Sequence, residues 1–383
     1  SANAIKISKS RLKRLNYVEG VDIEEVRVPG SLNQLDLNVK IKEKLAGSFN
    51  VGAGLGGSGT GFSLSAGVQQ DNFLGTGNKI GLNFNTAKTS KEYAFDFYNP
   101  YHNLDSVSRS FGFAFKTTKT DNTDTVSDYE ADRMSFRYSY GLPMTENNRF
   151  NLSLKYVSWN IGATTNSSNE IIEFINLNGE DFDNFSFLLN YSIDTRDSSQ
   201  MTRSGFKTKL STEVFVPGSD LEYYKLYFQT DSYFLVNKQK DVILRLKGIA
   251  KYGQGYGGTK GLPFYDRFKA GGPKSVRGYE KNSLSPLDSE GKPLGGDFMV
   301  AGTAEVIFTP PIEVANLKTA IFADFGRAYK DYDSFEFGDL KGSIGLSIKW
   351  LSPFGGVSVS ISTPLNSEEG DKTEGFQFNL GTN

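Results

Sequence analysis

Apolar and polar residues alternate along short segments of this 383-residue chain, from about residue 47 to its end. One segment places Phe62, Leu64 and Val68 between serine, glycine and glutamine, and the same rhythm returns around Phe185 and Ile344. A period of two predicts β-strands whose two faces differ in polarity. The pattern therefore predicts a fold made of many half-apolar strands.

Composition indicates what those faces contact. The chain is 13% aromatic, yet it is only 38% hydrophobic and its mean hydropathy is −0.39. No run approaches the roughly 18 apolar residues of a membrane helix, whereas a membrane-spanning strand needs only about 9–11 residues of weak alternation beside a wet lumen. The sequence thus favours a transmembrane β-barrel. A soluble β-sandwich or propeller also gives alternation and stays open on periodicity alone.

The number of candidate strands supports the barrel, because an even number brings both ends of the wall to one side of the membrane. We therefore predict an all-β fold, a 16-stranded antiparallel transmembrane barrel. The sixteen candidate strands begin near Phe49, Phe62, Lys79, Tyr93, Phe111, Met134, Phe150, Phe185, Phe206, Tyr224, Val242, Met299, Thr319, Ile344, Val357 and Phe376.

Short and long connections alternate between these strands. Bacterial outer-membrane barrels have short periplasmic turns and longer surface loops, so the alternation predicts which end faces which compartment. The expected periplasmic turns are 71–76, 99–105 and 141–147, and the expected surface loops are 117–128, 160–179 and 253–295.

The first 44 residues have a different pattern. The basic stretch 6–14 predicts a short amphipathic helix, and segments 21–28 and 35–41 predict two strands joined by a turn at 29–31. One helix and one hairpin bury little core. We interpret residues 1–44 as the C-terminal part of a small periplasmic α/β domain and residues 45–383 as the barrel.

Several function classes are disfavoured by the residues present. The net charge is −2 without a basic tract, which argues against nucleic acid as a partner. There is no cysteine, and the single histidine, His102, lacks the partners of a catalytic site. Two G-x-G-x-x-G matches, at 52–57 and 253–258, do not open a helix in a βαβ unit. We expect no enzymatic activity, no cofactor and no metal site.

Motifs along almost the whole chain carry a family resemblance. Segment 264–272 and the following Val276-Arg277-Gly278-Tyr279 resemble the long sixth surface loop of the BamA family of outer-membrane protein assembly factors, and segments 67–77, 217–220 and 376–381 match in order. The resemblance implies a Gram-negative outer-membrane protein with periplasmic POTRA domains, of which residues 1–44 are part of the last. It also implies unfolded barrel proteins as clients, outer-membrane lipids around the wall and lipoproteins as assembly partners.

Strand alternation places two carboxylates on the lumen side of neighbouring strands, Glu305 and Asp324. A guanidinium from a loop folded into the barrel could fork between them, and the resemblance points to Arg277. The alternative is a solvated loop arginine with both acids lining water. The predicted loop-anchoring cluster is Val276, Arg277, Gly278, Tyr279, Glu305 and Asp324.

The first and last strands form the seam of the predicted wall. The first strand is rich in glycine, which is easily distorted and offers few side chains to fix the pairing, and the last strand stops soon after Leu380. We predict that this seam parts and that its exposed edge templates client strands by β-augmentation. The predicted seam residues are Phe49, Asn50, Val51 and Gly52 on the first strand and Phe376, Phe378, Leu380 and Gly381 on the last.

Two rival functions remain open on the sequence. One is the two-partner secretion transporter of the same superfamily, which exports a dedicated substrate through its lumen. The other is a passive porin, whose wall needs no weak seam. A stable open conductance favours the porin, whereas faster folding of client barrels favours the assembly factor.

Overall fold

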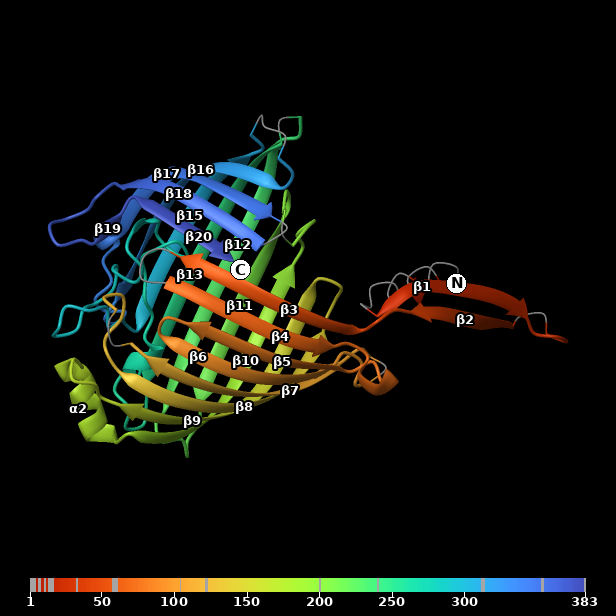
Figure 1. The fold of residues 1–383 in the computed structure, drawn as a ribbon, viewed down its shortest axis with the longest axis horizontal. Helices are drawn as coiled ribbons and strands as arrows, with labels where there is room; N and C mark the ends of the chain where they lie inside the picture. Colours follow the sequence, from red (N-terminus) through yellow and green to blue (C-terminus); the bar gives the residue numbers. More distant parts are fainter. Residues whose placement is uncertain are drawn as a thin grey trace.

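The computed structural model describes residues 5, 8–9, 12, 17–31, 34–56, 61–103, 105–120, 123–199, 201–239, 241–310, 314–352 and 355–381. Sixteen antiparallel strands among them close into one barrel (Figure 1). The predicted fold class and strand number are therefore confirmed. The helix expected at 6–14 falls largely outside the described residues. None of the described helices is long and apolar enough to cross a membrane.

The barrel wall follows the chain order, with β20 closing onto β3. Outside the wall, two short sheets are formed by β1 (Val18–Arg27) with β2 (Leu35–Glu43), and by β14 (Gly278–Tyr279) with β19 (Thr373–Glu374). The wall strands are β3 (Gly47–Gly56), β4 (Gly61–Gln70), β5 (Lys79–Ala87), β6 (Ser90–Asn99), β7 (Ser108–Lys119), β8 (Glu130–Pro143), β9 (Asn148–Gly162), β10 (Asp181–Asp194), β11 (Gly205–Phe215), β12 (Tyr223–Asn237), β13 (Val242–Gly255), β15 (Phe298–Phe308), β16 (Leu317–Tyr329), β17 (Lys341–Ser352), β18 (Gly355–Pro364) and β20 (Phe376–Gly381).

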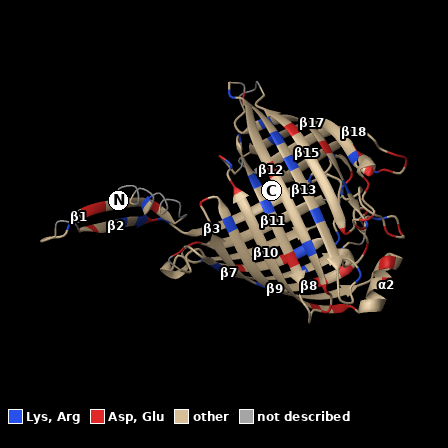
Figure 2. Ribbon diagram, turned by 180° about the vertical axis from the view of Figure 1, so that it is seen from behind, with Lys and Arg blue, Asp and Glu red and all other residues tan. Residues whose placement is uncertain are grey.

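The two faces of the wall differ as the alternation predicts. Phe62, Leu64 and Val68 are exposed on the outside, where hydrocarbon surrounds a membrane barrel. Charged residues also occur within the wall strands (Figure 2). Glu305 and Asp324 are examples that lie buried on the lumen side. Apolar side chains thus face lipid, while charges gather inside.

The two ends of the barrel carry different connections. The β1–β2 hairpin lies at one end, and the helix α2 (Asn169–Asn178) lies at the other (Figure 1). The three predicted short turns lie at the hairpin end and the three predicted long loops at the α2 end. The alternation is not strict, because residues 88–89 form a two-residue connection between β5 and β6 at the α2 end. The helix α2 was not predicted within the loop 160–179. Its apolar residues Ile171, Phe174 and Ile175 follow the helical spacing.

The hairpin of β1 and β2 confirms both strands expected in the first 44 residues. Its strands pair from Val18–Glu43 to Arg27–Leu35. The chain then enters the barrel beside the first short turn, where the Asp71 amide donates to the carbonyl of Ala46. The hairpin therefore continues almost directly into β3.

The connection between β13 and β15, residues 256–297, folds into and over the barrel; we call it loop 6. Phe264 of loop 6 packs with Phe174 of α2 and Phe182 of β10 in one buried apolar cluster. A second cluster joins Val276 of loop 6 to Met299 of β15. Apolar packing therefore holds loop 6 at two places, one against α2 and β10 and one against β15.

Candidate functional site

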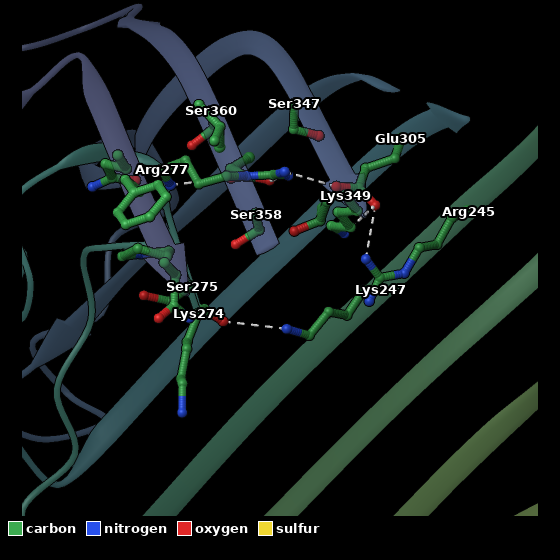
Figure 3. A pocket seen from close by; sticks show the side chains of 17 residues that line it. Arg245, Lys247, Lys274, Ser275, Arg277, Glu305, Ser347, Lys349, Ser358 and Ser360 are labelled. Atoms are coloured by element: carbon green, nitrogen blue, oxygen red, sulfur yellow. Dashed lines mark hydrogen bonds and ion pairs between the residues drawn. The ribbon is translucent and has the colours of Figure 1, made fainter. Parts of the chain in front are cut away.

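Arg277 of loop 6 and Glu305 of β15, two members of the predicted loop-anchoring cluster, lie close together in the lumen (Figure 3). The Arg277 guanidinium donates to both oxygens of Asp324, from Nε to Oδ2 at 2.7 Å and from Nη2 to Oδ1 at 2.8 Å. Its Nη1 donates to Oε1 of Glu305 at 2.7 Å. This is the expected fork, with one carboxylate bound through two parallel hydrogen bonds. The solvated-arginine alternative is excluded, because all three side chains are buried.

Glu305 has a second arginine partner that the sequence reasoning missed. Arg245 of β13 donates from Nη1 to Oε2 of Glu305 at 2.7 Å, and it also holds Asp231 of β12 through two hydrogen bonds of 2.8 Å. Arg245 lies opposite Glu305 in the ladder of β13 and β15. The signal was available, since strand alternation already places Arg245 on the lumen face.

Lys349 of β17 completes the charge pattern, with Nζ 3.4 Å from Oε2 of Glu305. The charges alternate in sign from β12, through loop 6, to β16, in the order Asp231, Arg245, Glu305, Arg277 and Asp324. Breaking one partner of a buried pair leaves an uncompensated charge and destabilises a protein by about 3–5 kcal/mol. Loop 6 is therefore fixed to the wall by mutually dependent ion pairs.

An aromatic ring supports the same guanidinium. The Arg277 guanidinium carbon lies 3.3 Å from the ring centre of Phe322, a buried lumen-side residue of β16. A cation over a ring face is attracted by the ring quadrupole, and arginine stacks well on such a face. A lysine at position 277 would lack both the fork and the stacking surface.

The residues around Arg277 explain the local sequence of loop 6. Val276 is fully buried in the second apolar cluster. Gly278 has a φ of +88°, and a Cβ there would lie 3.2 Å from Oγ of Ser362 and 3.3 Å from Cβ of Ser343. Only glycine fits this conformation without strain. Tyr279 is fully buried and donates to the carbonyl of Gly342 at 3.4 Å.

The seam between the two ends of the wall is short. β3 pairs with β4 along all ten of its residues, and β20 pairs with β18 along its six. Between β20 and β3, the described ladder contains two pairs, Asn379 with Gly56 and Leu380 with Leu55. The seam is therefore the shortest ladder among those described between neighbouring wall strands.

The predicted seam residues are partly corrected by this register. Leu380 is in the described seam ladder, whereas Phe49, Asn50, Val51 and Gly52 pair only with β4 among the described residues. Their place is taken by Leu55 and Gly56. Likewise Phe376, Phe378 and Gly381 pair with β18, not with a described residue of β3. The strands were predicted correctly, but the register depends on the stagger of the whole barrel, which local sequence does not reveal.

Glycine permits the close approach of β3 and β20. A Cβ at Gly54 would lie 2.6 Å from Oγ of Ser63 and 3.2 Å from the carbonyl oxygen of Leu380. A larger residue at position 54 would therefore displace either the serine side chain or the backbone of the last strand. The described glycines of the two G-x-G-x-x-G matches lie in β3, in β13 and in the turn that follows β13, and neither match opens a helix.

A cavity of about 70 Å³ is lined by Arg277 and Glu305 of the cluster (Figure 3). Gln377 and Asn379 of β20 also line it. Ser360 of β18 also faces it. The loop-anchoring cluster and the last strand of the wall are thus neighbours in the lumen, although sequence reasoning treated them as two separate sites.

Comparisons with known proteins agree with this architecture. The family model described as the Omp85 superfamily domain matches residues 72–383. The chain is 29% identical over 416 residues to the outer membrane protein assembly factor BamA of Neisseria meningitidis serogroup B, covering 98% of this chain and 52% of that protein. It spans about half the length of the curated relatives it matches first.

Solved structures give the same result. The crystal structure of BamA from Haemophilus ducreyi lacking POTRA domains 1–3 superposes with a TM-score of 0.87 at 27% identity, covering 100% of this chain and 78% of that one. CdiB from Acinetobacter baumannii has a TM-score of 0.62 at 14% identity, over 95% of this chain and 66% of that one. At that identity CdiB shares the fold alone.

Proposed function

Because this chain belongs to the Omp85 superfamily, we propose that it forms the membrane part of an insertase that folds and inserts other barrel proteins. It is an outer-membrane protein by its fold and its relatives. The observation that carries the proposal is the ladder between β3 and β20, which has two pairs among the described residues. It is the shortest of the described ladders of the wall, and it joins the two ends of the wall.

Opening the seam breaks few backbone hydrogen bonds. Each contributes about 0.5–1.5 kcal/mol net in ordinary protein surroundings, although an unpaired backbone group in hydrocarbon is destabilised by several kcal/mol. A ladder of two pairs therefore opens far more readily than the ten-pair ladder of β3 with β4. An incoming client strand pairs with the freed edge and replaces the lost bonds.

The remaining assignments follow from the same proposal. The clients are unfolded outer-membrane barrel proteins of a Gram-negative bacterium. Residues 1–44 form the end of the last POTRA domain, which lies in the periplasm with both chain ends and meets lipoprotein partners. The position of the β1–β2 hairpin at the short-turn end supports this orientation (Figure 1). Insertion exchanges hydrogen bonds only, so the proposed activity needs no enzyme chemistry and no cofactor.

Reconstitution tests the proposal against its two rivals. Full-length protein, with and without its partners, is placed in liposomes, and the folding rate of an urea-unfolded client barrel is followed by heat-modifiable gel mobility. We expect client folding several times faster than in empty liposomes. A stable open conductance without faster folding would support a porin, and export of one dedicated substrate would support a secretion transporter.

A further inference from the structure

The last strand is connected to loop 6 by a buried side chain, Gln377. This residue of β20 points into the lumen, and only 2% of it is exposed. Its Nε2 donates to the carbonyl of Tyr279 in loop 6 at 2.8 Å and to Oε2 of Glu374 at 3.1 Å. Tyr279 follows Arg277 by two residues in loop 6. One amide group thus joins the seam strand to the anchored loop.

Backbone pairing strengthens this connection. The short strands β14 and β19 pair Gly278 with Glu374 and Tyr279 with Thr373. The next amide of loop 6, that of Glu280, donates to the carbonyl of Lys372 at 2.9 Å. β19 leads into β20 with one residue between them. Loop 6 is therefore joined to the chain on both sides of the point where β20 begins.

The other end of this connection is the ion-pair cluster. Arg277 is held by Glu305 of β15 and Asp324 of β16. Gly278 fits closely between Ser343 and Ser362, so the loop has little room to shift between Arg277 and Tyr279. A continuous path of contacts runs from β15 and β16, through loop 6, to β20. It bypasses the strand-to-strand ladders of the wall.

Among the described ladders of the wall, the two that flank β20 are the shortest. β20 has six described pairs with β18 on one edge and two with β3 on the other. When the seam parts, the second edge loses its ladder, and β20 is then held only by β18 and by loop 6. A strand with one free edge frays easily, because its terminal pairs break one at a time.

We propose that Gln377 is a positioning residue that keeps β20 in register on β18 while the seam is open. Loop 6 transmits the rigidity of the Arg277 cluster to β20 through the Tyr279 carbonyl. The partner edge β3 then parts from an ordered strand, and the opening stays confined to the seam. This inference rests on the proposed insertase function but concerns which contacts hold the terminal strand.

A purely local role for Gln377 makes a different prediction. If the Gln377 amide only forms hydrogen bonds within its own surroundings, then losing this amide and losing the Arg277 fork have independent effects. If the two act along one path, the second substitution adds little once the first has broken the path. A double-mutant cycle separates the two cases, since neighbours in one network are not additive.

The test is hydrogen exchange of the β20 amides in lipid nanodiscs, with Gln377→Glu, Arg277→Lys and the double variant. Glu has nearly the same size but cannot donate to the Tyr279 carbonyl. We expect exchange in β20 to rise by at least roughly 5–10-fold in Gln377→Glu, because the variant loses one or two hydrogen bonds and places a second carboxylate beside Glu374, and to rise little further in the double variant. Unchanged exchange, or additive effects, would overturn the proposal.

The controls keep the outcome interpretable. Ser360→Ala removes a polar side chain of β18 from the same cavity, and we expect β20 exchange to stay at the wild-type rate. If Gln377→Glu fails to form a barrel, Gln377→Met keeps the volume without a buried charge and gives the same comparison. Client insertion is measured separately. A wild-type protein that inserts no client refutes the proposed function, whereas additive exchange refutes the role of Gln377 alone.

Discussion

Leu380 of the last wall strand lies directly opposite Leu55 of the first. Both side chains belong to the outward-facing set of their strands, and directly opposed residues of antiparallel strands have Cα atoms about 4.5–5.5 Å apart. This separation suits a disulfide bond. The chain contains no cysteine of its own, so a pair introduced at these two positions would be the only possible crosslink.

We predict that Leu55→Cys combined with Leu380→Cys blocks client insertion when oxidised, because the seam can no longer part. Reduction should restore insertion to the level of the reduced control. The measurement is client folding in proteoliposomes before and after reductant, with crosslinking verified by gel mobility. Full activity of the verified crosslinked protein would contradict the gate.

The matched control joins β3 to its other neighbour. Ala53 lies opposite Leu64 in the ladder of β3 and β4, and both positions face outward. A disulfide between cysteines at these positions should leave insertion nearly unchanged, because that ladder stays closed in the proposed mechanism. Equal inhibition by both crosslinks would show that rigidity of β3, and not closure of the seam, limits activity.

The shared carboxylate of Glu305 gives a second prediction. Glu305→Ala leaves Arg277 and Arg245 buried with one partner fewer each, which destabilises the loop attachment by about 3–5 kcal/mol and by less where lumen water reaches it. We expect faster proteolysis of loop 6 and weaker client insertion. Limited proteolysis in intact liposomes measures the first effect, and wild-type protection together with wild-type insertion would refute the anchoring role.

Arg277→Lys tests geometry apart from charge. Lysine keeps the positive charge but cannot form two parallel hydrogen bonds with Asp324 or stack on Phe322 in the same way. We expect loop 6 to become protease-sensitive, to an intermediate degree between wild type and Arg277→Ala. If lysine protects loop 6 as well as arginine does, then charge alone holds the loop.

Gly278→Ala tests the tight passage of loop 6 along the wall. The added Cβ would meet Ser362 and Ser343, and alanine disfavours the positive φ of this residue. We expect a destabilisation of about 1–3 kcal/mol, seen as earlier proteolysis of loop 6. Gly291→Ala is the control, since Gly291 also has a positive φ but nothing lies within 4 Å of its Cβ position. Equal effects would indicate backbone strain without crowding.

A pH dependence is expected at the base of loop 6. Burial raises the pKa of Asp297, which lies just before β15, to about 6. The positive charge of Arg267 and the hydrogen bond from the Leu262 amide lower this pKa, whereas the negative charge of Asp331 raises it further. Because the folded pKa exceeds the unfolded value of about 3.9, the folded loop binds the proton more tightly. Its stability is therefore highest below pH 4 and declines as the pH rises to about 6.

The Asp297→Asn variant tests whether the stability of the loop declines as the pH rises. The neutral amide should remove the decline between pH 4 and pH 6, which amounts to about 3 kcal/mol at most in the wild type. The measurement is the protection factor of the Leu262 amide, which donates to Asp297 at 3.1 Å, corrected for the intrinsic exchange rate at each pH. A wild-type protection factor that rises with pH would contradict the assignment.

The strands of the wall could be predicted from the sequence because each strand shows the alternation of apolar and polar residues within its own segment. Period-two alternation assigned faces to residues such as Glu305 and Asp324 correctly, and it depends only on neighbours along the chain. The same alternation places Arg245 of β13 on the lumen face. Predicting the ion pair between Arg245 and Glu305, however, requires the register of β13 on β15.

At the seam, the sequence pattern did not predict the register between β3 and β20. Phe49 and Leu55 share a strand and a face, so alternation cannot choose which of them meets Leu380. The choice follows from the stagger accumulated around sixteen strands. Gln377 was missed for a related reason: its partner Tyr279 lies 98 positions away in a loop, and no local pattern joins them.

The central claim is that the ladder between β3 and β20 is the weak point of the wall, and hydrogen exchange of the unmodified protein in lipid nanodiscs tests it most directly. The account predicts that amides at 55–56 and 379–380 exchange at least about tenfold faster than those in the long ladder of β9 and β10. Equal protection of the two ladders would contradict the account.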